Sequence, residues 1–125
     1  MSVVHFEIPA DDVNRAKDFY GKAFGWKIDQ YPGMDYFMVS TTPSDENGMP
    51  KSPGAINGGL AKREGPLKAP VVTIRVEDID GALHTVKKLG GGVEVPKQSL
   101  GDMGFTAYFS DSEGNIVGLW QDAKK

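Results

Sequence analysis

Apolar and polar positions follow one order in the first half of the chain. Alternating residues from Val3 to Ile8 predict a strand, and an amphipathic helix follows with Asp12 as its N-cap and Gly25 as its stop. Three more strands are predicted at 26–31, 34–41 and 55–61. The segment 42–54 is rich in proline and glycine, which predicts a long mobile loop before the last of these strands.

The second half repeats this order. A strand at 71–76 is followed by the cap Asp78 and by an apolar helical stripe that ends before Gly90. The remaining strands are predicted at 93–95, 105–110 and 116–121. Asp12 and Asp78 are 66 residues apart, as are Ala16 and Ala82, so the chain contains an internal repeat.

The repeat predicts an α+β fold of two tandem βαβββ modules, at about 1–61 and 70–125, with a polar linker at about 62–69. One helix covers only one face of a four-stranded sheet, so the other face needs a partner. We therefore expect the two sheets to enclose a ligand cleft. At 125 residues, the chain is predicted to form a single domain over 1–125.

Composition narrows the expected partners and compartment. A formal charge of −3 gives no general attraction to nucleic acid or to a membrane surface, so neither is expected as a partner. Without cysteine there is no disulfide, thiolate metal site or cysteine nucleophile. The first residues lack the pattern of a signal peptide, and no apolar run approaches the roughly 20 residues of a membrane span, which predicts a cytoplasmic protein.

Strand alternation divides the first strand of each module into a core row and a cleft row. The rows placed beneath the helices are Val4, Phe6 and Ile8 in the first module and Val72, Ile74 and Val76 in the second. Val3 and Val71 belong to the opposite rows, whose polar members are His5, Glu7, Thr73 and Arg75. Polar groups in a cleft need partners or a ligand, so these four are candidate ligand-binding residues.

Structural explanations compete with these roles. Glu7 and Arg75 occupy matched positions and could form an ion pair only, and His5 could be a satisfied structural histidine. His84 lies outside the apolar stripe of its helix and is expected to be exposed. Four further candidates could line the cleft or be core or structural residues: Tyr36, Met38, Asn57 and Trp120.

Three motifs carry a family resemblance. They are HFEIPADD at 5–12, AKDFYGKAFGW at 16–26 and DSEGNIVGLW at 111–120. With the repeated layout, they resemble the vicinal oxygen chelate superfamily, which includes glyoxalase I, bleomycin-resistance proteins and extradiol dioxygenases. The resemblance covers essentially the whole chain. It implies this fold and a homodimer, but not one reaction, because the superfamily hosts many chemistries.

Enzymes of this family commonly bind one divalent metal with histidines and glutamates of the first and last strands. Here Val3 and Val71 stand at the usual histidine positions, and Gly118 stands where a glutamate usually precedes Leu-Trp. His5 faces the same way as Val3 but is displaced by about 6.6 Å at 3.3 Å per residue. Arg75 on the opposite wall would repel a cation. The resemblance therefore implies a small-molecule binder without a metal cofactor.

Two enzyme functions remain open at this point. The first is a glyoxalase-like lyase or dioxygenase in which His5 and Glu7 bind one divalent metal ion. The second is a metal-free enzyme with Glu7 as general base and Arg75 stabilising an enolate-like charge. In the binding protein, Arg75 and His5 would receive an anionic or polar group of the ligand. A scaffold or dimeric partner without a ligand is the remaining alternative.

Overall fold

The chain forms two compact units, each built around one helix and its own strands. A computed structural model describes residues 1–33, 36–46 and 49–123. One unit is His5–Pro70, and the other combines Met1–Val4 with the chain from Val71 onward. The predicted α+β fold with two repeated modules is confirmed. The predictions of a single domain and of a ligand cleft both depend on how the two units are arranged, so they stay predictions.

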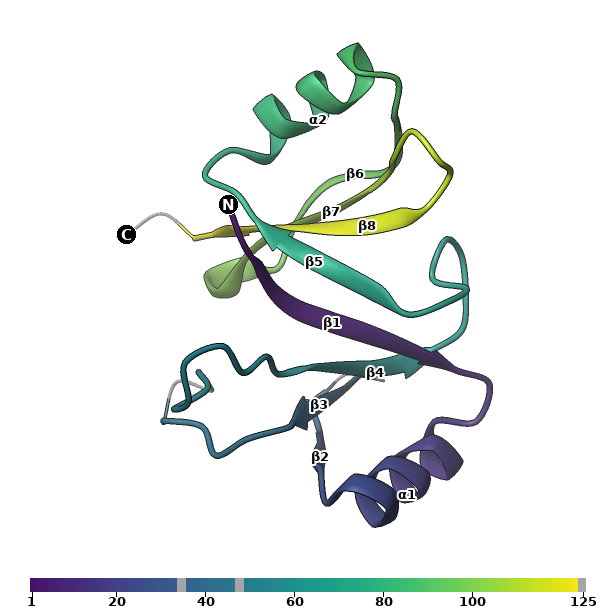
Figure 1. The fold of residues 1–125 in the computed structure, drawn as a ribbon, viewed down its shortest axis with the longest axis vertical. Coiled ribbons are helices and arrows are strands. Elements are labelled where there is room, and N and C mark those ends of the chain that lie inside the picture. The colour runs from purple at the N-terminus through teal and green to yellow at the C-terminus, as the bar shows by residue number, and fades with distance from the viewer. Residues whose placement is uncertain (34–35, 47–48, 124–125) are drawn as a thin grey trace. The chain divides into compact units, whose positions relative to one another are not determined.

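The first unit contains a mixed sheet with one helix. Its hydrogen-bonded strand order is β2-β3-β4-β1, in which β1 and β4 run parallel and the other pairs are antiparallel (Figure 1). Its elements are β1 (Val3–Ala10), α1 (Val13–Phe24), β2 (Lys27–Gln30), β3 (Tyr36–Ser40) and β4 (Gly58–Lys62). The prediction began the last strand at residue 55, three residues too early, and residues 34–35 of the third lie outside the described residues.

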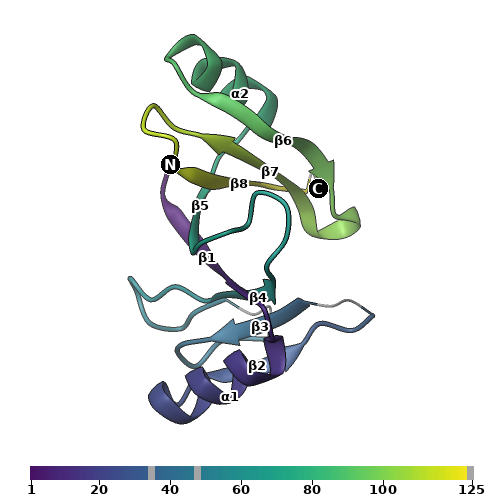
Figure 2. The same cartoon turned by 90° about the vertical axis from the view of Figure 1, so that its right-hand side faces the viewer.

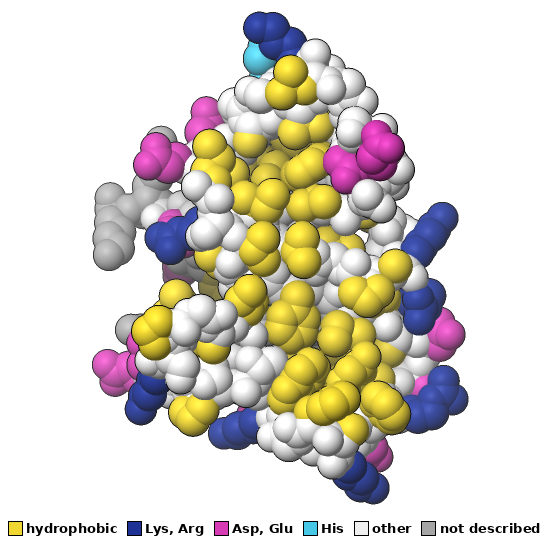
Figure 3. All heavy atoms as spheres, in the orientation of Figure 1, with side chains coloured by type: hydrophobic (Ala, Val, Ile, Leu, Met, Phe, Trp, Pro, Cys, Tyr) yellow, Lys and Arg dark blue, Asp and Glu magenta, His cyan; other side chains and the backbone are white. Residues whose placement is uncertain are grey.

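Helix α1 has the predicted ends. The Asp12 carboxylate accepts a hydrogen bond from the Arg15 amide at 3.0 Å, and Gly25 ends the helix in the left-handed conformation at φ 69°. The apolar side of α1 packs on Ile28, Val39 and Leu60 of the sheet. Larger rings stay at the surface: Phe19 and Phe24 are 61% and 63% exposed, and apolar side chains gather over α1 in Figure 3.

The second unit repeats this plan. The strand order is β1-β5-β8-β7-β6, with only the first residues of β1 belonging to this unit, and α2 packs on one face of the sheet (Figure 2). Its elements are β5 (Val71–Arg75), α2 (Ile79–Lys88), β6 (Gly92–Ser99), a 3-10 turn (Gly101–Met103), β7 (Gly104–Ser110) and β8 (Ile116–Asp122). The sequence predicted β6 as only 93–95, but the strand continues past Pro96 through register shifts.

Two expectations for this unit need correction. Val72 is 48% exposed and lies outside the core, which on this face of β5 begins at Ile74. Ile74 and Val76 do pack with the core beneath α2, as predicted. Asp78 is the N-cap of α2, but its side chain makes no capping bond; the buried Gln121 amide oxygen instead accepts from the Ile79 amide at 2.9 Å.

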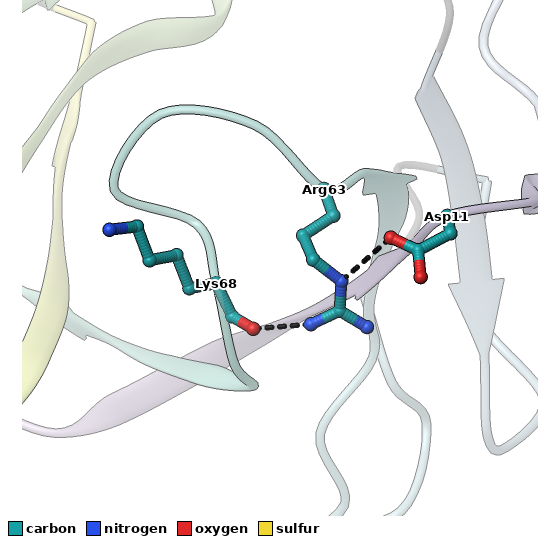
Figure 4. Close-up of polar contacts among 3 residues, drawn as sticks. All are labelled: Asp11, Arg63 and Lys68. Atoms are coloured by element: carbon teal, nitrogen blue, oxygen red, sulfur yellow. Dashed lines mark hydrogen bonds and ion pairs between the residues drawn. The ribbon is translucent and has the colours of Figure 1, made fainter.

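The predicted linker forms an ordered turn on the first unit. The Arg63 side chain donates from Nε to Asp11 at 3.0 Å and from its terminal nitrogen to the Lys68 carbonyl (Figure 4). Leu67 is buried, and its amide donates to the Glu64 carbonyl at 3.1 Å. These contacts fasten the segment to the turn between β1 and α1. Within the described part of the chain, no helix is long and apolar enough to cross a membrane.

Candidate functional site

The candidate site lies on one face of the first unit's sheet, which we call the polar face. It is the side of β2-β3-β4-β1 opposite the core residues Phe37, Val39 and Leu60. Strand register fixes its membership, because Glu7 pairs with Gly59, Gly59 with Met38, and Met38 with Asp29. By the same alternation it carries His5, Glu7, Tyr36, Met38, Gly59, Lys27 and Asp29.

A hydrogen bond between His5 and Tyr36 joins two strands of the polar face. The Nε2 atom of His5 lies 2.9 Å from the hydroxyl of Tyr36, and both side chains are partly buried. Burial lowers the pKa of His5 because it penalises the imidazolium, so the ring is neutral near pH 7. Burial also raises the pKa of Tyr36, and the Glu7 carboxylate raises it further. The phenol therefore keeps its proton throughout the physiological pH range.

Gly59 makes room for the Tyr36 hydroxyl. A Cβ atom at position 59 would lie 1.7 Å from that oxygen, so any side chain there would have to displace the ring. Gly59 was not among the candidate residues predicted from the sequence. A glycine inside a strand can also mark a close approach, which is the signal that could have found this one.

A groove of about 700 Å³ adjoins the polar face at one end of β3. Met38, which is 42% exposed, is shared between the face and the groove. The groove is lined by Gly25, Lys27, Met38, Ser40 and the loop residues 41–46. Its volume is in the range of small-molecule sites.

Asn57 holds the loop that forms this groove. Its side-chain oxygen accepts from the Thr41 amide at 2.9 Å, and its side-chain nitrogen donates to the Ser44 hydroxyl at 2.7 Å. Asn57 lies just before β4 rather than within it. These bonds support the structural explanation of Asn57, and they add Ser44, which the sequence analysis did not single out. The predicted mobility of the whole loop is untested, and residues 47–48 lie outside the described residues.

In the second unit, Thr73 is buried rather than open to solvent. It is 4% exposed and pairs with Gly118 on the neighbouring strand. A Cβ atom at position 118 would lie 2.7 Å from the Thr73 hydroxyl oxygen. Thr73 therefore fills the space beside a glycine within its own unit, and a role in ligand binding stays a prediction.

Arg75 and Trp120 share a partner that the sequence analysis missed. The Arg75 guanidinium forms an ion pair with Asp122, and the Trp120 indole nitrogen donates to the other oxygen of that carboxylate at 2.9 Å. Arg75 lies opposite Trp120 across β5 and β8, so Asp122, two residues further along, lies within reach. An ion pair between Glu7 and Arg75 would join the two units and stays a prediction. That Trp120 lines a ligand cleft also stays a prediction.

The donor set does not fit the divalent metal that the sequence resemblance implies for its enzymes. Such a metal needs three or four ligands that converge on one point. Over residues 1–33, 36–46 and 49–123, no three histidine, aspartate or glutamate side chains are placed to do so. His5 Nε2 is engaged with Tyr36, and glycines stand at 59 and 118, where a carboxylate would meet Tyr36 or Thr73.

Comparisons with known sequences agree with the motifs. A family model for the N-terminal part of bleomycin resistance protein-like proteins matches residues 2–42. A glyoxylase-like domain-containing protein of Didymella fabae is 35% identical over 114 residues, which cover 87% of this chain and 84% of that protein. The provisionally named glyoxylase CFP32 of Mycobacterium tuberculosis is 30% identical over 122 residues, or 92% of this chain. The chain spans only 43% of the length of CFP32.

Solved structures share the fold at low sequence identity. A glyoxalase/bleomycin resistance protein/dioxygenase superfamily member from Vibrio splendidus superposes with a TM-score of 0.62 at 17% identity, covering 98% of both chains. A variant of Streptomyces coelicolor methylmalonyl-CoA epimerase in complex with 2-nitronate-propionyl-CoA gives a TM-score of 0.64 at 16% identity, covering 98% of this chain and 97% of the other. At these identities the likeness establishes the fold alone.

Proposed function

Since this chain belongs to the vicinal oxygen chelate superfamily, within its glyoxalase and bleomycin-resistance-like members, we propose that it binds a small molecule on the polar face without a metal. The observation that carries the proposal is the His5–Tyr36 hydrogen bond on the sheet face opposite the core. Two neutral polar groups meet there beside the exposed thioether of Met38. Apolar surface with a few convergent polar groups is the usual composition of a ligand site.

The chemistry of the polar face supports binding by hydrogen bonds and apolar contact. Tyr36 supplies a protonated hydroxyl and His5 an uncharged ring. Met38 supplies an adaptable apolar surface, and the adjoining groove gives a ligand room to extend toward the loop at 41–46. None of these contacts requires an ion to complete it.

A fragment screen on metal-stripped protein tests this function. Uniformly ¹⁵N-labelled protein, treated with EDTA and dialysed, would be titrated with a set of small organic fragments while its backbone amide shifts are followed. We expect some fragments to shift the amides of His5, Tyr36, Met38 and Gly59. A set that shifts none of them, or that shifts them only after Zn²⁺ or Mn²⁺ is restored, would contradict the proposal.

The family also leads us to propose that the chain forms a homodimer. Sedimentation equilibrium would test this independently of ligand binding. A single species of 13.5 kDa at high micromolar concentration would exclude the homodimer.

A further inference from the structure

The two modules place a glycine at the same position of their last strands. In the first module Glu7 of β1 lies opposite Gly59 of β4, and in the second Thr73 of β5 lies opposite Gly118 of β8. Each glycine is followed by a buried leucine, Leu60 or Leu119, so the register match is exact at the neighbouring core position as well. The 66-residue offset of Asp12 and Asp78 matches Glu7 to Thr73 rather than to Arg75, so Gly59 is the repeat equivalent of Gly118.

A hydroxyl occupies the space beside each glycine. The position of a Cβ atom lies 1.7 Å from the Tyr36 oxygen at Gly59 and 2.7 Å from the Thr73 oxygen at Gly118. Neither position can accept a longer side chain unless its neighbour moves. Because Gly118 stands where the family resemblance puts a glutamate, both modules have a neutral hydroxyl in the place of an acidic side chain.

Near Tyr36 the described part of the polar face carries a carboxylate, Glu7, and its one lysine, Lys27, pairs with Ser40 at the other end of β3. By strand register, the charged side chains of its described part are Glu7, Lys27 and Asp29, and Lys27 forms an exposed ion pair with Asp29 at 3.8 Å. His5 is partly buried and hydrogen-bonded to Tyr36. A carboxylate placed beside Tyr36 would lose part of its hydration next to Glu7, while Lys27 lies four residues away along the strand register and is paired with Asp29.

We propose that the polar face selects a ligand with an uncharged carbonyl group, which accepts a hydrogen bond from the Tyr36 hydroxyl while the Nε2–H tautomer of His5 donates to the oxygen of that hydroxyl. Tyr36 is then the residue that determines specificity. Gly59 is a positioning residue, because its lack of a side chain leaves space for the Tyr36 hydroxyl beside His5. This inference rests on the proposed function, since it names the ligand class of the same face. It differs from the expectation of an anionic or polar group received by His5 and Arg75, which stays a prediction.

Two probes of similar size separate the ligand classes. Acetophenone carries a ring and an uncharged carbonyl, and benzoate carries the same ring and a carboxylate. Each would be titrated into ¹⁵N-labelled wild-type protein and the Tyr36→Phe variant, which keeps the ring and removes only the hydroxyl. Tyr20→Phe is the matched control, because Tyr20 packs with the core beneath α1 in the same module.

We expect acetophenone to shift the amides of His5, Tyr36 and Gly59 and to bind more tightly than benzoate. Loss of one neutral hydrogen bond should weaken acetophenone binding by about three- to tenfold in Tyr36→Phe and leave it unchanged in Tyr20→Phe. The inference is overturned if benzoate binds this face more tightly, or if Tyr36→Phe binds acetophenone as well as wild type does.

The proposed function can survive the failure of this inference. If fragments of the general screen shift the polar face and acetophenone does not, the face binds small molecules but the assigned ligand class is wrong. If neither the screen nor the two probes shift any of its amides, the proposed function fails, and the inference fails with it.

Discussion

Substituting Gly59 by alanine should disrupt the polar face through one atom. The new Cβ would lie 1.7 Å from the Tyr36 oxygen, whereas ordinary contacts begin near 3.4 Å, so the ring must move by about 1.7 Å. A movement of that size breaks the 2.9 Å bond to His5. The lost hydrogen bond should cost about 1 kcal/mol and overpacking about 1–3 kcal/mol. Alanine also lowers the conformational entropy of the unfolded chain, which stabilises the folded state by less than about 1 kcal/mol.

The net expectation is a loss of about 1–4 kcal/mol in the free energy of unfolding. Urea unfolding followed by tryptophan fluorescence would measure it, and the midpoint should fall by about 1 M. The matched control is Gly21→Ala in α1, where the new Cβ would meet only the Trp26 carbonyl oxygen at 3.6 Å. That variant should be unchanged or more stable by up to about 1 kcal/mol, because alanine is the better helix former.

A double variant separates the clash from other effects of the alanine. Tyr36→Ala removes the ring, so adding Gly59→Ala to it should cost much less than Gly59→Ala costs in the wild type. A wild-type midpoint for Gly59→Ala, or additivity of the two substitutions, would show that the clash with Tyr36 does not occur.

Three further predictions concern His5, the loop and the last hairpin. Burial holds the pKa of His5 below its ordinary value of 6.5, so as pH falls the unfolded chain binds this proton before the folded chain does, and stability should fall below about pH 6.5. Urea midpoints measured between pH 7.5 and 5.5 should fall less steeply in His5→Gln than in the wild type. An unchanged slope would contradict this. Asn57→Ala should lower stability by about 1–2 kcal/mol and speed hydrogen exchange of the Thr41 amide, while Ser52→Ala, which removes one exposed 3.4 Å contact to Thr42, should not. Hydrogen bonds from the Asn115 amide and side chain and from the Glu113 amide hold the pKa of Asp111 below its ordinary value, so Asp111→Asn should lower the urea midpoint at pH 7. The difference in midpoint between wild type and variant should shrink as pH falls through the folded-state pKa of Asp111. A difference that does not depend on pH would exclude the charge of Asp111 as its cause.

The element order was predictable because its signals are local. Asp12 and Gly25 mark the ends of α1 through capping chemistry that acts within a few residues, and the structure places both as expected. Asp78 shows the limit of such signals: its position was predicted, but the capping oxygen comes from Gln121, 42 residues away along the chain. Only the fold brings that amide to the helix.

Strand alternation predicted the two sides of β1 for the same reason. Phe6 and Ile8 pack on the core, and His5 and Glu7 lie on the other side. The partners of these residues could not be predicted, because they depend on the register between strands. Tyr36 reaches His5 only because Gly59 lies between β1 and β3 without a side chain. Arg75 forms its ion pair with Asp122 in its own unit because β5 pairs with β8.

We expect a small molecule to bind the polar face without a metal. Two crystals of EDTA-treated protein would be soaked with the strongest fragment from the screen, and one of them would then also be soaked with Zn²⁺. We predict the fragment within hydrogen-bond distance of the Tyr36 hydroxyl in both crystals, with no anomalous peak beside His5. Density for the fragment elsewhere, or an ion about 2.0–2.1 Å from His5 Nε2 in place of the Tyr36 bond, would contradict the claim.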